Sequence, residues 1–169
     1  MTSRMIPATK EDVAQLHTLL LRPKHGREMG QHLTLYAAHP IPEENDRGGR
    51  NANNWQMVVQ GTVQEGWVNA LGNLHGAAAA WLVDQLTSAA LSRLATPTFW
   101  GPPMLGGVSI QLDMTYYNPA PTGTKVRIVV TVERMARTLA NTRCDILEWD
   151  TGKRLASGTH AKAWRPAKM

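Results

Sequence analysis

The sequence contains a single cysteine, Cys144, among its 169 residues. One thiol cannot form an internal disulfide, which excludes a disulfide-stabilised scaffold and fits a reducing compartment. Although the net charge is +5, the sequence has no block of like charges, so we expect a solvated surface and no nucleic-acid-binding face. His25, His32 and His39 are evenly spaced but have no accompanying cysteine or acid cluster, and we expect no metal site.

The sequence also lacks an uncharged apolar run long enough to cross a membrane. Asp84 interrupts the longest apolar stretch, so we expect no membrane insertion. The first thirty residues mix acids and bases and do not contain the apolar core of a signal peptide. The last three residues, Ala167-Lys168-Met169, loosely resemble a peroxisomal targeting tripeptide. We therefore expect a cytoplasmic protein, with a peroxisomal location as the alternative.

The length and the hydrophobic fraction of 43% predict one globular domain with its own core. Near the N-terminus, Thr9 precedes two acids and a run of leucines at helical spacing that ends at Pro23, which predicts a capped amphipathic helix. We expect this helix to cover part of a sheet or of a neighbouring subunit. Residues 26–54 show no periodicity and are expected to be an extended loop. Residues 1–54 would thus form an N-terminal extension, and 55–166 the domain proper.

Alternating apolar residues predict five β-strands in the remainder of the chain. The expected strands are 55–64, 108–117, 125–135, 139–149 and 154–164. One long helix, about 75–95, separates the first strand from the other four. Strands in succession after a single helix predict an α+β fold, in which an antiparallel sheet packs against that helix.

The long helix is almost wholly apolar and carries one internal carboxylate, Asp84. It begins with four alanines, Ala77–Ala80, and small side chains allow other elements to approach closely. An all-round apolar helix is expected to be buried. A buried carboxylate requires a partner, a shifted pKa or a catalytic role.

The turn before this helix contains Asn69, Asn73, His75 and Gly76. Backbone N–H groups at a helix start lack internal acceptors, and a glycine there leaves room for a ligand oxygen. This arrangement suits a polarised carbonyl or an oxyanion. Asp84 lies nine residues after His75, about 13 Å along the helix. If both groups act on one substrate, the simplest geometry pairs the helix start of one subunit with the carboxylate of another.

Three separated segments carry a family resemblance. In chain order they are Asn69-Ala-Leu-Gly-Asn-Leu-His75-Gly76, Leu82-Val83-Asp84 and Gly107-Val-Ser109-Ile-Gln-Leu-Asp-Met-Thr-Tyr116. In this order they resemble the hotdog-fold acyl-CoA thioesterases, and most closely the phenylacetate-type, acyl-CoA thioesterase 13-like branch. The resemblance extends from about Trp55 to Trp164. One departure is Ala77, where the family usually has a second glycine after the histidine.

The resemblance implies a hotdog fold, in which the sheet wraps around the long helix, and hydrolysis of acyl thioesters by a homodimer or a dimer of dimers with shared active sites. It implies that Asp84 is a general base or a nucleophile and that Ser109 positions the water. It also implies that Asn69 orients the thioester carbonyl, which the Gly76 N–H binds, and that His75 braces the turn. Arg137, His160 and Lys162 are candidate contacts to the phosphates of CoA. CoA is a substrate in this scheme, and neither a cofactor nor a metal is implied.

Two alternative functions remain open at this stage. The same fold could act on a carrier-bound polyketide or a related ester, a reading motivated by Ala77, Trp81 and the loop at 26–54. The chain could also be a non-catalytic acyl-binding protein in which Asp84 is structural.

Overall fold

The structure is a computed structural model that describes residues 4–165. Seven strands form one antiparallel sheet in the order β1-β2-β3-β5-β6-β7-β4. The elements are β1 (Ile6–Pro7), α1 (Lys10–Leu21), α2 (Arg27–Gly30), β2 (Thr34–Ala38), β3 (Trp55–Thr62), a 3-10 turn (Glu65–Trp67), α3 (Gly76–Leu94), β4 (Val108–Tyr116), β5 (Lys125–Met135), β6 (Leu139–Glu148) and β7 (Arg154–Ala163).

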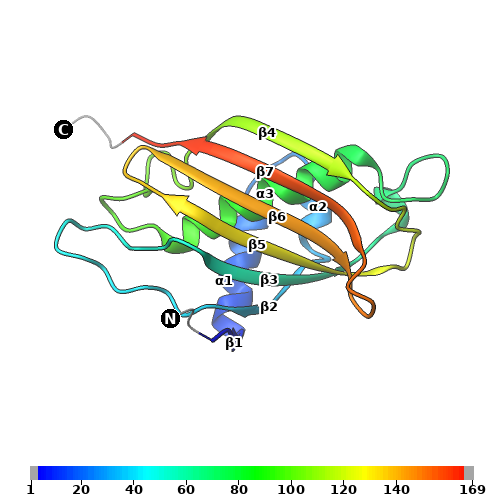
Figure 1. The fold of residues 1–169 in the computed structure, drawn as a ribbon, viewed down its shortest axis with the longest axis horizontal. Coiled ribbons are helices and arrows are strands. Elements are labelled where there is room, and N and C mark those ends of the chain that lie inside the picture. The colour runs from blue at the N-terminus through cyan, green and yellow to red at the C-terminus, as the bar shows by residue number, and fades with distance from the viewer. Residues whose placement is uncertain (1–3, 166–169) are drawn as a thin grey trace.

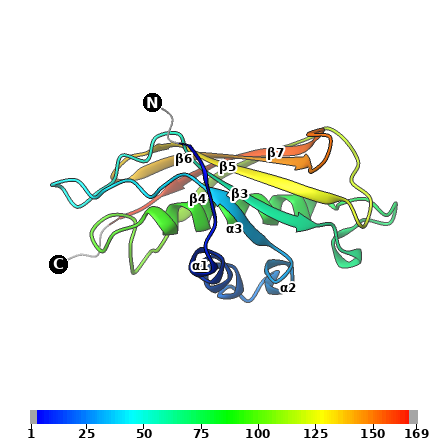
Figure 2. The same ribbon diagram turned by 90° about the horizontal axis from the view of Figure 1, so that it is seen from below.

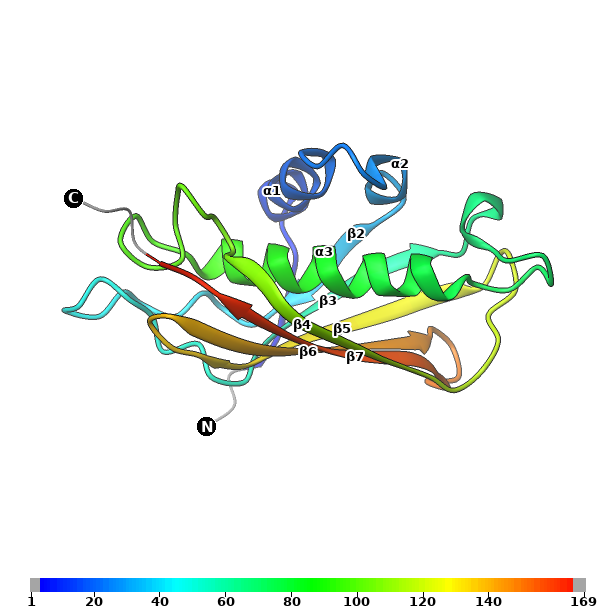
Figure 3. The same cartoon turned by 90° about the horizontal axis from the view of Figure 1, so that it is seen from above.

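The long helix α3 packs along one face of the sheet (Figure 1). Seen edge-on, α3 lies between the sheet on one side and the two short N-terminal helices on the other (Figures 2 and 3). This confirms the expected α+β arrangement of an antiparallel sheet around one long helix. Strand β4 forms one edge of the sheet and β1 the other.

The expected long helix and five strands all occur, each within one or two residues of the expected bounds. The expectation of a continuous loop over residues 26–54 is wrong at Thr34–Ala38. This segment is strand β2, which pairs with β3 in the sheet, and the four-residue helix α2 precedes it. Residues 39–54 form the remaining loop, which contains an isolated bridge between Glu44 and Arg50.

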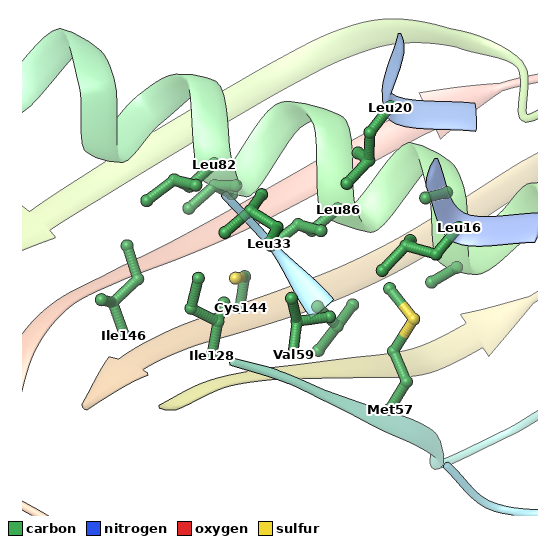
Figure 4. Close-up of a cluster of buried hydrophobic side chains, with 14 of the residues drawn as sticks. Leu16, Leu20, Leu33, Met57, Val59, Leu82, Leu86, Ile128, Cys144 and Ile146 are labelled. Carbon is green, nitrogen blue, oxygen red and sulfur yellow. The ribbon is translucent and has the colours of Figure 1, made fainter. Parts of the chain in front are cut away.

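The core lies between α3 and the sheet (Figure 4). Leu82 and Leu86, one turn apart on α3, are fully buried and face buried side chains of the strands. Their partners in the close-up include Val59, Ile128 and Ile146. Gly158 on β7 permits this packing, since a Cβ there would lie 2.8 Å from the nearest methyl of Val83.

Helix α1 begins at the expected cap. The Thr9 hydroxyl accepts a hydrogen bond from the Asp12 N–H at 3.1 Å, and the Asp12 carboxylate accepts one from the Thr9 N–H at 2.9 Å. Asp12 also forms an ion pair with the buried Arg93 of α3, with 2.6 Å between Oδ1 and Nη2. Helix α1 lies over α3 on the side away from the sheet (Figure 3) and also contacts strand β2, so the expectation that it covers part of the sheet holds at β2.

Within residues 4–165, no helix combines the length and the hydropathy that crossing a bilayer requires. The tripeptide Ala167-Lys168-Met169 lies outside the described residues.

The ion pair of Asp12 leads to a prediction about stability. The Arg93 guanidinium, followed by the Thr9 hydrogen bonds, lowers the pKa of Asp12 from 3.8 to about 2. We expect Asp12→Asn to lower the free energy of unfolding by about 1–3 kcal/mol, because it leaves the buried guanidinium without its counter-charge. A carboxyl whose folded pKa is depressed stabilises the protein above its unfolded pKa and loses this effect as the pH falls.

The difference between wild type and Asp12→Asn should therefore shrink between pH 4 and pH 2. Urea denaturation across this range measures it. Glu11→Gln, in the same first turn, is the matched control and should change stability little. An equal loss in both variants would show that α1 does not depend on the ion pair.

Candidate active site

Asp84 lies on the flank of α3 that faces strands β4 and β7. Its side chain retains 35% of its exposure in the single chain. The expectation of a fully buried carboxylate is therefore wrong for one chain, because α3 buries only the faces directed at the sheet and at α1. Ala77 is exposed and Ala80 is half-buried on the same flank.

The two carboxylate oxygens of Asp84 have different partners. Oδ2 accepts a hydrogen bond from Gln85 Nε2 at 2.8 Å. Oδ1 lies 3.2 Å from Ser109 Oγ and 3.6 Å from His160 Nε2. The structure thus brings together Asp84 and Ser109, which the sequence predicts as partners, and adds His160.

A β-bulge in β4 aims Ser109 at the helix. Ser109 pairs with Lys162 of β7 and Gln111 pairs with Ala161, so Ile110 is an extra residue between them. Since side chains alternate along a strand, an unbulged β4 would turn Ile110 toward α3 in place of Ser109. The bulge leaves Ile110 58% exposed at the sheet edge.

His160 is buried at the centre of a chain of polar contacts. Its Nδ1 lies 2.6 Å from Thr87 Oγ1, and its Nε2 lies 2.8 Å from Ser109 Oγ. Burial of the ring, followed by the nearby Lys162 ammonium, lowers the pKa of His160 to about 4, although Asp84 opposes this shift. The imidazole is therefore neutral at pH 7, and its contact with Asp84 is not an ion pair there.

The hydrogen-bond donors of the neighbours assign the tautomer of His160. The Thr87 hydroxyl has one proton and donates it to the Val83 carbonyl at 2.7 Å, so it accepts from His160 Nδ1–H. Nε2 then carries a lone pair and accepts the proton of Ser109, whose contact with Nε2 is shorter than its contact with Asp84. Asp84 Oδ1 lies 3.2 Å from the same hydroxyl and, as a half-exposed carboxylate oxygen with two lone pairs, can also accept a hydrogen bond from a water molecule.

Lys162 is also buried beside this chain. Its Nζ donates to Ser88 Oγ at 2.8 Å and lies 3.4 Å from Ser109 Oγ. The expectation that His160 and Lys162 contact CoA phosphates does not fit a geometry in which only 1% and 3% of these residues is exposed. Both point inward because they alternate with outward-facing residues on β7.

Thr87, Ser88 and Gln85 belong to the cluster, although the sequence reasoning did not select them. Thr87 and Ser88 follow Asp84 by three and four residues, the spacing that places side chains on one helix face. This spacing is the feature of the sequence that could have identified Thr87 and Ser88 as neighbours of Asp84.

The start of α3 has the expected cap. His75 Nδ1 accepts a hydrogen bond from the Ala77 N–H at 2.9 Å, which braces the turn. Within residues 4–165 the Gly76 N–H has no acceptor. The Tyr116 hydroxyl donates to the Gly76 carbonyl at 3.1 Å, and a Cβ on Gly76 would lie 3.2 Å from that hydroxyl oxygen. A glycine therefore leaves room for the Tyr116 ring against the first turn of α3.

Asn69 shapes the same turn with one end of its side chain. Oδ1 accepts from the Leu71 N–H at 2.9 Å and from the Asn73 N–H at 3.3 Å. Its amide Nδ2 donates to no acceptor among the described residues and can hydrogen-bond a substrate carbonyl.

Two expected site residues lie apart from Asp84. Gly76 precedes it by eight residues, about 12 Å along one helix, so the two groups cannot contact one small ligand within a single chain. Arg137 is exposed in the turn between β5 and β6, and within residues 4–165 it forms no ion pair.

A cavity of about 460 Å³ adjoins the polar cluster. Gln85 and Ser88, both partners of cluster residues, form part of its wall, and α1 and the loop before β4 form the rest. The remaining lining residues are Leu19, Arg22, Pro23, Ala89, Ser92, Pro103, Met104, Leu105, Gly107 and Val108.

Comparisons with known proteins identify related chains. A family model described as the thioesterase superfamily matches residues 71–153. Human acyl-coenzyme A thioesterase 13 is 37% identical over 107 residues, which cover 63% of this chain and 71% of that protein. The crystal structure of mouse thioesterase superfamily member 2 is 25% identical, with a TM-score of 0.69 over 92% of this chain and 98% of that one.

A more distant solved structure shares the fold. It is a hypothetical thioesterase protein from Streptococcus pneumoniae with coenzyme A, 20% identical, with a TM-score of 0.58 over 70% of this chain and 85% of that one.

The contacts of His160 lead to a spectroscopic prediction. We expect the ¹⁵N signals of its ring to report a neutral Nδ1–H tautomer at pH 7, and its titration midpoint to lie near pH 4. The exposed His75 is the comparison within the same spectrum. A midpoint near 6.5, or a protonated Nε2 at pH 7, would contradict this proton assignment.

Proposed function

We propose that this chain, which belongs to the thioesterase superfamily, hydrolyses acyl thioesters and uses acyl-CoA as its substrate. Its sheet around α3 is the hotdog fold of that superfamily. The observation that carries the proposal is Asp84 Oδ1, held beside Ser109 and His160 on the half-exposed flank of α3. Relatives named acyl-CoA thioesterases support the choice of substrate.

In the mechanism we propose, Asp84 removes a proton from water as the water attacks the thioester carbon. Ser109 is close enough to orient that water, because its oxygen lies 3.2 Å from the accepting carboxylate oxygen. The carbon–sulfur bond then breaks, and the products are the free acid and the CoA thiol. A nucleophilic role for Asp84 is the alternative on the same geometry.

The thioester carbonyl would accept hydrogen bonds from the Gly76 N–H and the Asn69 amide. An N–H at a helix start is already oriented and lies at the positive end of the helix dipole. Such a donor stabilises negative charge on the carbonyl oxygen in the transition state. His75, as the cap, keeps the backbone of the first turn in place.

We propose that the two halves of the site come from two subunits of a homodimer. Strand β4 is an edge of the sheet, and Val108 and Ile110 on it are 49% and 58% exposed. A long edge strand with exposed apolar side chains favours pairing with another strand. Pairing of two β4 strands would bring the flank of α3 that carries Asp84 close to the partner subunit. A dimer of dimers is the larger assembly we consider.

Arg137 remains our candidate for a contact to CoA phosphates, as an exposed cation without an ion-pair partner in the described chain. The cavity beside Ser88 offers space for part of the substrate next to the cluster. The free thiol of Cys144, which is buried, is compatible with a cytoplasmic protein.

A screen of acyl-CoAs with a thiol-trapping dye tests the proposed activity. Release of CoA thiol supports it. Turnover of a carrier-bound acyl thioester or a small ester, with no acyl-CoA turnover, would favour the specialised hydrolase. Binding of acyl-CoA without cleavage would favour the acyl-binding protein.

Substitution of the proposed base gives the first kinetic prediction. Asp84→Asn preserves size and hydrogen bonding but removes basicity, so we expect kcat to fall by about 10²–10⁴-fold while the protein stays folded. Asp150→Asn, in the exposed turn before β7, is the matched control and should retain activity. Wild-type turnover by Asp84→Asn would eliminate this residue as base and as nucleophile.

Mixed dimers test the shared site. Asn69→Ala and Asp84→Asn homodimers should each be nearly inactive. In a heterodimer of the two variants, one site collects both changes and the other has neither, so activity should return to roughly half the wild-type value per dimer. Differently tagged subunits allow the heterodimer to be purified and its hydrolysis rate measured. If purified heterodimers stay inactive, each site lies within one chain.

A further inference from the structure

Lys162 is a buried cation that is involved neither in the proposed activation of water nor in the proposed contacts to the thioester carbonyl. Only 3% of the residue is exposed, and its Nζ contacts two hydroxyl oxygens, those of Ser88 and Ser109. Within residues 4–165 no carboxylate lies within ion-pair distance of Nζ. Burying an ammonium group without a direct counter-ion costs free energy, whereas an apolar side chain would fill the same space without that cost. A structural role alone therefore accounts poorly for this lysine.

The hydroxyl groups around Lys162 have a defined direction. An ammonium group only donates hydrogen bonds, so both serine oxygens accept from it. The Ser88 proton then goes to the Asp84 carbonyl at 2.7 Å, and the Ser109 proton goes to His160 Nε2 at 2.8 Å. Lys162 thus holds Ser109 between His160 Nε2 and Asp84 Oδ1.

The charge of Lys162 also acts on its two titratable neighbours, Asp84 on α3 and His160 on β7. Burial lowers the pKa of Lys162, and the charge of Asp84 raises it in part. This attraction is mutual, so the ammonium and the carboxylate hold one another across the cluster. The same ammonium disfavours a charged His160. Both effects make the arrangement around Ser109 depend on Lys162.

We propose that Lys162 is a positioning residue of the thioester hydrolase, which acts through Ser109 and, through its charge, on His160 to maintain the hydrogen-bond arrangement that directs Asp84 at the attacking water. This inference rests on the proposed function. It replaces the expectation that Lys162 contacts a CoA phosphate. Lys162 touches neither substrate nor water in this scheme.

The test compares kinetics and His160 titration in Lys162→Met, which keeps the length of the side chain and removes its charge. We expect kcat to fall by about 10- to 100-fold, the loss of one charge-assisted hydrogen bond, with KM nearly unchanged. The midpoint of His160, followed by NMR, should rise from about 4, because the ammonium that disfavours the charged ring is gone. The acid limb of the kcat/KM profile should move up with it, since the neutral His160 accepts the proton of Ser109.

Three further variants separate charge from hydrogen bonding. Lys162→Arg retains the charge, so its acid limb should stay near that of the wild type even if kcat falls because the planar group fits poorly. Ser88→Ala removes one acceptor and should leave the acid limb unmoved. Lys153→Met removes an exposed cation from the turn before β7 and should change nothing. Lys162→Gln serves in the same comparison if Lys162→Met does not fold.

A folded, uncharged variant with the wild-type pH profile and an unmoved His160 midpoint would overturn the proposal and leave Lys162 as a packing residue. A movement of the acid limb in Lys162→Arg as large as that in Lys162→Met would also overturn it. If the wild type hydrolyses no acyl thioester, the proposed function fails. The His160 midpoint then still shows whether Lys162 sets the electrostatics of the cluster.

Discussion

The packing of α3 against the sheet is the constraint on which the rest of the structure depends. Burial of Leu82 and Leu86 fixes the rotation of the helix about its axis. At about 100° per residue, Asp84, midway between them in sequence, must then lie outside this core face, on the flank toward the edge strand β4. The same packing fixes where the helix begins, and therefore where the Gly76 N–H points. A single hydrophobic contact surface thus places both the carboxylate and the oriented donor, although neither takes part in the core.

The edge strand β4 lies next to both parts of the proposed site, the carboxylate of Asp84 and the start of α3. Strand β4 contributes Ser109 through its bulge and Tyr116 through its contact with the helix start, so it touches both ends of the proposed site. Its outer edge has no partner strand in the single chain. A half-exposed carboxylate becomes a stronger base when its surroundings exclude water. In the dimer we propose, the contact that supplies the missing donor would also provide that exclusion, so assembly and chemistry would depend on the same strand.

The sequence predicts the fold well because its periodicities are long and unambiguous. Strands of eight or more alternating residues and a nineteen-residue apolar helix leave little choice of element. The sequence does not predict strand β2, because five residues are too few for a clear period. Leu33, Leu35 and Ala37 alternate there, but the run is short. The prediction for His160 and Lys162 went wrong for another reason. Their polarity suggests exposure to solvent, but their alternation with Thr159 and Ala161 places them on the inner face of the sheet. Only the packed structure shows that hydroxyl groups of α3 lie within hydrogen-bond distance of them.

The polar cluster is best understood by following its protons in one direction. The Thr87 hydroxyl donates its proton to a helix carbonyl. His160 therefore donates to Thr87 and accepts from Ser109. Each buried group is thereby satisfied, as buried polar groups must be. The chain ends at Asp84 Oδ1, which lies 3.2 Å from Ser109 Oγ and still faces solvent. A carboxylate oxygen can accept more than one hydrogen bond, so this oxygen can also bind a water molecule. Its half-exposed position, next to a cavity and an edge of the sheet, is what a site for activating water requires.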